Sequence, residues 1–194
     1  ELFDALRRAR WPEATLRTNP EPLENFTVSS EKFDVVLLHY VLNELSPAAR
    51  RTLLARAARS LAPNGRLVVC EPLVRDEGDS MRELRAYALA DLKLHVLAPC
   101  PHEQACPLGE PCHDVHILNA ALHPDPPPLP YASLFLTPAP PAPAPTLRAR
   151  VIGSPTHAKG QTLCPGCCSD GQIHRLQLLH RDFDTAGRKD LRHL

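Results

Sequence analysis

Two apolar runs in the first hundred residues have the pattern of strands buried within a sheet. Residues 33–39 form a nearly continuous series of β-branched residues and leucines, and residues 66–70 repeat the pattern. Parallel strands that are covered on both faces have continuous apolar runs, whereas strands with one solvent-exposed face alternate between apolar and polar residues. The pattern therefore predicts two strands of a parallel sheet, each buried on both faces.

The segment between these runs predicts an amphipathic helix. Ser46 and Pro47 have the residue types of an N-cap and a first helical position. Apolar residues over 53–61 recur at helical spacing, and Asn64-Gly65 is a typical helix stop. A strand, a helix and a second strand make a βαβ unit, for which a right-handed crossover is expected.

The remaining elements are mostly short strands. We expect a helix at 80–94, strands at 95–98, 131–136, 147–152 and 173–179, and a hairpin turn at Asp170-Gly171. Proline-rich stretches within residues 123–145 predict extended backbone there.

These elements divide the chain into three parts, and the expected fold class is α/β. The parts are an α/β domain over residues 1–98, a small β-rich, cysteine-containing appendage over 99–182 that includes the proline-rich excursion 123–145, and a basic tail over 183–194.

Charge is informative only toward the end of the chain. The 22 basic and 22 acidic residues give a net charge of zero, so the overall balance indicates no class of partner. From residue 146 onward, however, there are eight basic and four acidic residues. A basic segment of this kind is consistent with contact to RNA phosphates, and a basic segment that is merely solvated is at least as common. The candidate RNA-binding residues are Arg175, Arg181, Arg188 and Lys189. No run of 18 apolar residues occurs, so no membrane span is predicted.

The candidate chemistry lies in a loop rich in cysteine and proline. Cys100, Cys106 and Cys112 are each separated from the next by five residues, and prolines accompany all three. Proline fixes φ and removes a backbone donor, so this stretch is neither a helix nor an inner strand. Three thiols in one loop predict a metal centre, whose fourth ligand would come from a second thiol cluster. That cluster consists of Cys164, Cys167 and Cys168.

The residues alone leave several kinds of thiol chemistry open. Four thiolates can hold either Zn²⁺ or a [4Fe–4S] cube, and five-residue gaps favour the larger object. A disulfide framework also stays open, as does a loop that binds no metal. Cys70 lies in a predicted strand and is interpreted as a core residue. His102 and His113 are interpreted as loop histidines that hydrogen-bond to backbone, with direct ligation of the metal as the alternative.

Polar residues also follow the two predicted parallel strands. Asn43 and Glu44 come after the first strand, and Glu71 comes after the second, at the edge where α/β sheets bind their ligands. The sequence contains no G-x-G-x-x-G loop that would cradle a nucleotide. We therefore interpret Asn43 and Glu44 as a turn and a helix cap, and predict no catalytic or cofactor-binding residue among them.

Several stretches together resemble a known family. Residues 33–45 (FDVVLLHYVLNEL) and 61–72 (LAPNGRLVVCEP) are similar to the second half of a class I S-adenosylmethionine methyltransferase. More specific are APCPHE at 98–103, ACPL at 105–108, Cys112-His113, Lys159-Gly160, Cys167 and SDG at 169–171. Over residues 30–182 the chain thus resembles the methyltransferase-like assembly factors of the mitochondrial ribosomal small subunit and their bacterial relatives.

The resemblance implies a fold, a cofactor and partners. The fold would be the C-terminal half of a Rossmann-like class I methyltransferase fold, binding small-subunit ribosomal RNA and proteins during ribosome assembly. The protein would be located in the mitochondrial matrix, or in the cytoplasm of a bacterium. A [4Fe–4S] cluster would be held by Cys100, Cys106, Cys112 and Cys167. The glycine loop for the methyl donor would precede residue 1, so S-adenosylmethionine is expected to bind only in a longer chain.

Two other functions remain open from the sequence. One is an S-adenosylmethionine-dependent RNA methyltransferase that is truncated here, and the other is a zinc-binding interaction module. The expectation for this chain is an assembly factor that supports mitochondrial translation with little or no methyltransferase activity of its own.

Overall fold

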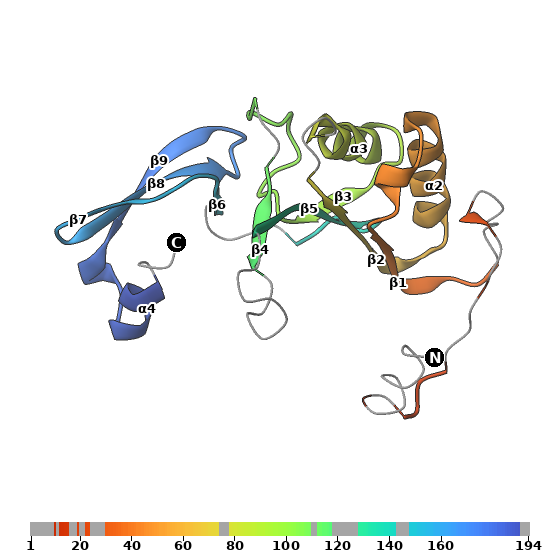
Figure 1. The fold of residues 1–194 in the computed structure, drawn as a ribbon, viewed down its shortest axis with the longest axis horizontal. Helices are drawn as coiled ribbons and strands as arrows, with labels where there is room; N and C mark the ends of the chain where they lie inside the picture. The colour runs from red at the N-terminus through yellow and green to blue at the C-terminus, as the bar shows by residue number, and fades with distance from the viewer. Residues whose placement is uncertain are drawn as a thin grey trace.

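The computed structural model describes residues 10, 12–15, 19, 22–23, 30–73, 78–109, 112–117, 128–142 and 148–190. The strands are β1 (Phe33–His39), β2 (Leu61–Pro72), β3 (His95–Ala98), β4 (Asp114–Ile117), β5 (Pro128–Thr137), β6 (Ala149–Val151), β7 (Thr156–Ala158), β8 (Gln161–Cys168) and β9 (Ile173–Leu179). The helices are α2 (Pro47–Arg59), α3 (Gly78–Ala90) and α4 (Thr185–Asp190), with the short 3-10 helices η2 (Leu42–Glu44) and η3 (His180–Asp182). The strands form two sheets that lie side by side (Figure 1).

The first sheet has the strand order β1-β2-β5-β3, and β4 pairs with β5 beside this path. Strands β1 and β2 are parallel and α2 connects them, which confirms the predicted strand-helix-strand unit. Strand β5 runs antiparallel to both β2 and β3 and lies between them. The chain is thus a mixed α/β protein, as expected. Because β5 comes from residues 128–137, part of the expected appendage belongs to the α/β sheet.

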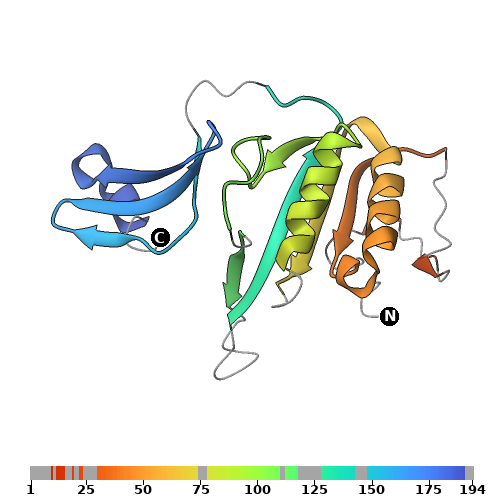
Figure 2. The same ribbon diagram turned by 90° about the horizontal axis from the view of Figure 1, so that it is seen from above.

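Helices α2 and α3 cover the same face of this sheet (Figure 2). The residues buried beneath them include Leu54, Leu67, Val69, Leu84, Ala88, Leu134 and Leu136. On β1, by contrast, the side chains of Val35 and Leu37 are 60% and 59% exposed. The prediction that β1 is buried on both faces is therefore wrong, because successive side chains of a strand point to opposite faces and the described helices cover only one of them.

Helix α2 begins where the sequence predicts it. Ser46 has extended backbone, its Oγ accepts a hydrogen bond from the Ala49 N–H at 3.4 Å, and Pro47 is the first helical residue. A side-chain oxygen at the N-cap satisfies one of the backbone donors that the first helical turn leaves free.

The end of α2 differs from the prediction. The helix ends at Arg59, and Asn64-Gly65, the predicted stop, already belongs to β2. Gly65 instead permits close approach of two strands, since a Cβ there would lie 2.8 Å from the carbonyl oxygen of Phe33. Helix α3 likewise ends at Ala90 rather than at residue 94, and β3 follows as predicted.

The second sheet is antiparallel and has the order β6-β8-β7, with β9 also paired to β8. Strands β8 and β9 form the predicted hairpin, in which Gly171 adopts a φ of +79°. The cysteine-rich loop, residues 99–109 and 112–113, lies between the two sheets in both ribbon views (Figures 1 and 2). Among the described helices, none has the length and apolar character that a membrane span requires.

Candidate metal centre

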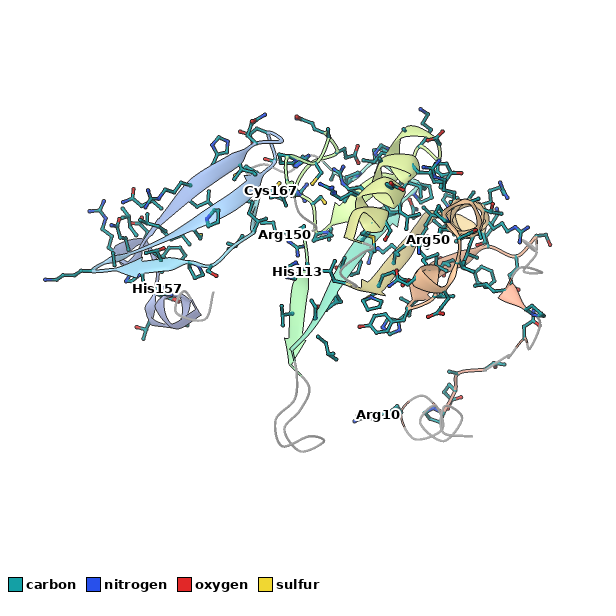
Figure 3. The ribbon with its side chains drawn as sticks, turned by 45° about the horizontal axis from the view of Figure 1, so that its top comes forward. Arg10, Arg50, His113, Arg150, His157 and Cys167 are labelled. Carbon is teal, nitrogen blue, oxygen red and sulfur yellow. The ribbon has the colours of Figure 1, made fainter. Side chains whose placement is uncertain are left out.

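The four predicted ligands come from two distant segments that meet at the junction of the sheets. Cys100 follows β3, Cys106 lies in the middle of the loop, Cys112 precedes β4, and Cys167 lies on β8. The three loop thiols line one cavity, together with Met81, Arg82 and Arg85 of α3 and with Pro99, Ser133 and Leu134. Figure 3 shows Cys167 at this junction, with further sulfur atoms close to it.

The thiols of the loop and of β8 influence one another electrostatically. Burial raises the pKa of the Cys167 thiol, and the charges of Cys100, Cys106 and Cys112, then of Cys168, raise it further. Burial also raises the pKa of Cys112, whereas the nearby Arg150 guanidinium opposes this. Thiolates raise each other's pKa values because like charges repel, so four of them at one place need a positively charged partner. A metal centre would supply that charge.

The thiols are neighbours, but they do not converge on one point. Within the described residues, no three side chains of His, Cys, Asp or Glu are grouped as a single metal ion requires. A tetrahedral Zn²⁺ site places sulfurs about 2.3 Å from the metal and hence about 3.8 Å from one another. All seven cysteines are free thiols, so no disulfide framework is formed.

Strand geometry distinguishes Cys167 from the other two cysteines of β8. Successive side chains of a strand point to opposite faces, so Cys164 and Cys168 share one face and Cys167 takes the other. Cys164 and Cys168 are fully buried, and the Cys168 thiol approaches the Gly166 carbonyl at 3.7 Å. Cys70 lies on β2 and is partly buried.

Two arginines of α3 hold the backbone of the cysteine loop. Arg85 donates from Nη2 to the His102 carbonyl at 2.7 Å and from Nη1 to the Gln104 carbonyl at 3.0 Å. Arg82 donates from Nη1 to the Leu108 carbonyl at 2.6 Å. Guanidinium groups present several donors in a rigid fork, which suits them to carbonyls that helices and strands leave unpaired.

These arginines were not among the residues predicted from the sequence, although the sequence holds a signal for one of them. Arg85 is one residue from Leu84 and three from Ala88, both buried, so it lies on the apolar side of the helix. A charged residue at such a position is rarely buried unless it has a partner.

Glu103 fixes the same loop to the first sheet. Its Oε1 accepts a hydrogen bond from the Val96 N–H of β3 at 2.9 Å and lies 3.1 Å from His95 Nδ1. With Arg85 on one side and β3 on the other, the backbone around residues 102–104 has partners on two elements. The loop is therefore ordered by contacts with protein as well as by its prolines.

His102 turns its ring to Cys167. Its Nε2 lies 3.2 Å from Cys167 Sγ, and only 8% of the residue is exposed. Burial lowers the pKa of the imidazole, the Arg85 charge lowers it further, and the Gln104 carbonyl and Asp170 partly oppose this. Besides the Gln104 carbonyl, the ring therefore has a thiol as its neighbour. His113, the other histidine of the loop, is exposed.

Two further contacts join the sheets at this place. Arg150 of β6, the cross-strand neighbour of Cys167, forms an ion pair with Asp114 of β4, with 2.9 Å between Nη2 and Oδ1. The Gln104 side chain packs directly against Gly171 in the β8–β9 turn. Arg150 thus carries positive charge to the thiols and ties the two sheets together.

The polar residues at the strand ends have structural partners, in agreement with their interpretation as a turn. The carboxylate of Glu71, which is buried, accepts from the N–H groups of Val41, Leu42 and Asn43 at 3.1, 3.0 and 3.3 Å. Asn43 donates from Nδ2 to the Pro72 carbonyl at 3.0 Å. These contacts tie η2 to the end of β2.

The candidate RNA-binding residues lie near the end of the chain. Arg175 is exposed on β9, and the Arg181 side chain of η3 is 82% exposed and lies 3.7 Å from Asp182. Arg188 and Lys189 belong to α4, but their side chains lie outside the described residues.

The model of a family described as "Mitochondrial small ribosomal subunit Rsm22" matches residues 4–188. The chain belongs to the Rsm22 family. Membership implies a role with the mitochondrial small ribosomal subunit, and it confirms the resemblance that the cysteine loop carries in the sequence. A search of curated proteins found no match to the chain.

Proposed function

We propose that this chain is an iron-sulfur assembly factor that binds small-subunit ribosomal RNA and supports mitochondrial ribosome assembly and translation in the matrix. Its membership of the Rsm22 family supports the ribosomal part of this proposal. The observation that carries the cofactor is the cavity lined by Cys100, Cys106 and Cys112, in the loop whose His102 contacts Cys167 of the second sheet.

The residues present fit a [4Fe–4S] cluster. Cys100, Cys106, Cys112 and Cys167 would hold it, and four thiolates are the usual donor set of such clusters. The five-residue gaps between the three loop cysteines favour the cluster over the zinc-binding module. When bound, the cluster would supply positive charge and a link between two segments more than fifty residues apart. The chain itself contributes the cysteine loop, whose backbone is held by Arg82 and Arg85 and which presents three of the four thiols.

RNA binding would use the basic segment that begins at residue 146. Exposed Arg175 and Arg181 are available to phosphates, and Arg188 and Lys189 extend the same charge by sequence. Each phosphate contact releases counterions, so the affinity should fall linearly with salt on a logarithmic scale. An affinity for a small-subunit RNA fragment that does not change with salt would remove these residues from the proposal.

The second candidate is an S-adenosylmethionine-dependent RNA methyltransferase. The parallel pair β1 and β2 with its connecting helix α2 favours a Rossmann-like sheet of the class I kind. In this chain, however, Glu71 and Asn43 at the carboxyl edge are engaged by backbone groups. We therefore propose that the methyl donor binds only in a longer chain. Saturable heat on titration of this chain with S-adenosylmethionine would contradict this.

Iron analysis of matched variants tests the cofactor. Protein purified without oxygen should be brown and contain about four irons per chain. Cys167→Ser should lose iron, whereas Cys164→Ser should keep it, because that thiol lies on the same strand and faces the other way. A colourless protein with one zinc would overturn the cluster, and equal iron in both variants would overturn the ligand assignment.

A further inference from the structure

We propose that His102 is a positioning residue for the metal centre, whose Nε2–H donates a hydrogen bond to the Sγ of Cys167 when that thiolate is a ligand. The inference rests on the proposed iron-sulfur function and adds a residue to it. The donor would hold Cys167 in the orientation for binding and would set the reduction potential of the bound cluster.

The distance and burial of the contact support a hydrogen bond. His102 Nε2 lies 3.2 Å from Cys167 Sγ, and both side chains are buried. A nitrogen donor and a sulfur acceptor at this separation are in contact without room for water between them. The thiolate therefore receives a donor in a place where water does not compete.

The other ring nitrogen indicates which tautomer is present. Among the described residues, His102 Nδ1 is buried and has no hydrogen-bond partner. A proton on Nδ1 would be a buried donor without a well-placed acceptor, whereas a proton on Nε2 would point at sulfur. Leaving a buried donor unpaired costs about 1–3 kcal/mol, so the Nε2–H tautomer is favoured.

The protein fixes both partners of this contact independently. Arg85 binds the carbonyls of His102 and Gln104, and Glu103 binds β3, so the backbone that carries the ring is held on two sides. Cys167 is held in the ladder of β8 between Arg150 of β6 and Ile173 of β9. The approach of ring and sulfur thus follows from the two sheets being docked.

A donor at this sulfur has a defined electronic consequence. Reduction adds negative charge to a cluster and its thiolate ligands, and an N–H group pointing at a ligand sulfur stabilises that added charge. Removal of the donor should therefore favour the oxidised cluster and lower the reduction potential. A residue that only filled space would leave the potential unchanged.

The experiment compares four variants of the chain purified without oxygen. His102→Ala and His102→Leu remove the donor, and the leucine keeps the buried space filled in case the alanine variant does not fold. His102→Gln keeps an N–H donor on a side chain of similar reach. His113→Ala changes the exposed histidine of the same loop and is the control.

The readouts are iron content and the potential at which the reduced-cluster signal appears in electron paramagnetic resonance. We expect about four irons in every variant, a lower potential in His102→Leu and His102→Ala, and values close to the original in His102→Gln and His113→Ala. Equal potentials in all variants would overturn the inference. Loss of iron in His102→Leu and His102→Gln, with nitrogen coupling in the original spectrum, would instead make His102 a ligand. Absence of any cluster in the unmutated chain would overturn the proposed function itself.

Discussion

Gly171, in the turn between β8 and β9, lies directly against the side chain of Gln104 in the cysteine loop. A Cβ on Gly171 would come closer to Gln104 Oε1 and Cδ than atoms can approach, and it would lie 3.3 Å from Gln104 Cβ. Gly171 also has a φ of +79°, which glycine adopts at little cost. One residue therefore serves both the hairpin turn and the docking of the two sheets.

Gly160 provides a matched control for this relationship. It has the same φ of +79°, but a Cβ there would meet nothing within 4 Å. Gly160→Ala should therefore cost only the left-handed backbone strain, about 1–2 kcal/mol of unfolding free energy. Gly171→Ala should cost more, because Gln104 must also be displaced, and a Gln104→Ala background should remove the excess. Urea unfolding measures the free energy of unfolding of Gly160→Ala, Gly171→Ala, Gln104→Ala and the double variant of Gly171→Ala with Gln104→Ala. If Gly160→Ala and Gly171→Ala lose the same unfolding free energy while Gln104 is present, Gln104 moves aside freely.

Arg85 makes the most buried contacts to the cysteine loop. Arg85→Met should leave the carbonyls of His102 and Gln104 without their donor and destabilise the chain by about 2–4 kcal/mol. It should also speed the labelling of the loop thiols by a maleimide, since the loop loses its attachment to α3. Arg59→Met, at an exposed position at the end of α2, is the control and should change both measurements little. Unchanged labelling in Arg85→Met would show that the loop is held by other contacts.

Glu71 stabilises the end of β2 through three backbone donors. In Glu71→Gln one oxygen becomes an amide nitrogen that faces N–H groups, so we expect a loss of about 1–3 kcal/mol of unfolding free energy. Glu44→Gln changes an exposed carboxylate of η2 and should have little effect. If Glu71→Gln and Glu44→Gln lose the same unfolding free energy, the three hydrogen bonds to Glu71 contribute no more to stability than hydrogen bonds to water would.

Asp170 should give the β8–β9 hairpin a sensitivity to acid. The Gln172 N–H, 3.0 Å from Oδ1, and then His174, 2.6 Å from Oδ2, lower the pKa of this carboxyl below its ordinary value. A lowered pKa in the folded state gives stability that is present above the unfolded pKa, about 3.9, and is lost as the pH falls through the folded value. Asp170→Asn should remove that dependence. If the unfolding free energies of the unmutated chain and of Asp170→Asn change with pH in parallel between pH 2 and 5, Asp170 does not give the hairpin this sensitivity to acid.

Local signals in the sequence were sufficient for several elements. Ser46-Pro47 specifies the start of α2 through its own cap, and Asp170-Gly171 specifies a hairpin through the turn that glycine permits. Both predictions depend on neighbouring residues alone, and both were confirmed. The stop at Asn64-Gly65 failed because the same residue types also allow two strands to approach closely, which sequence spacing does not distinguish.

The tertiary relationships were beyond such signals. Nothing in residues 128–137 indicates that β5 inserts between β2 and β3, since a strand's neighbours depend on the whole sheet. The approach of His102 to Cys167, 65 residues away, likewise depends on how two sheets dock. The cysteine spacing did predict which loop would matter, because prolines and thiols restrict a loop wherever it lies in the fold.

The division of the four proposed ligands between the sheets has a thermodynamic consequence. Three thiols belong to the loop held by α3, and the fourth arrives on β8 of the other sheet. For a centre held by all four, docking of the sheets and retention of the metal are one coupled equilibrium. Linkage is reciprocal: a partner that bridges both sheets tightens the hold on the metal, and loss of the metal weakens the hold on that partner by the same factor.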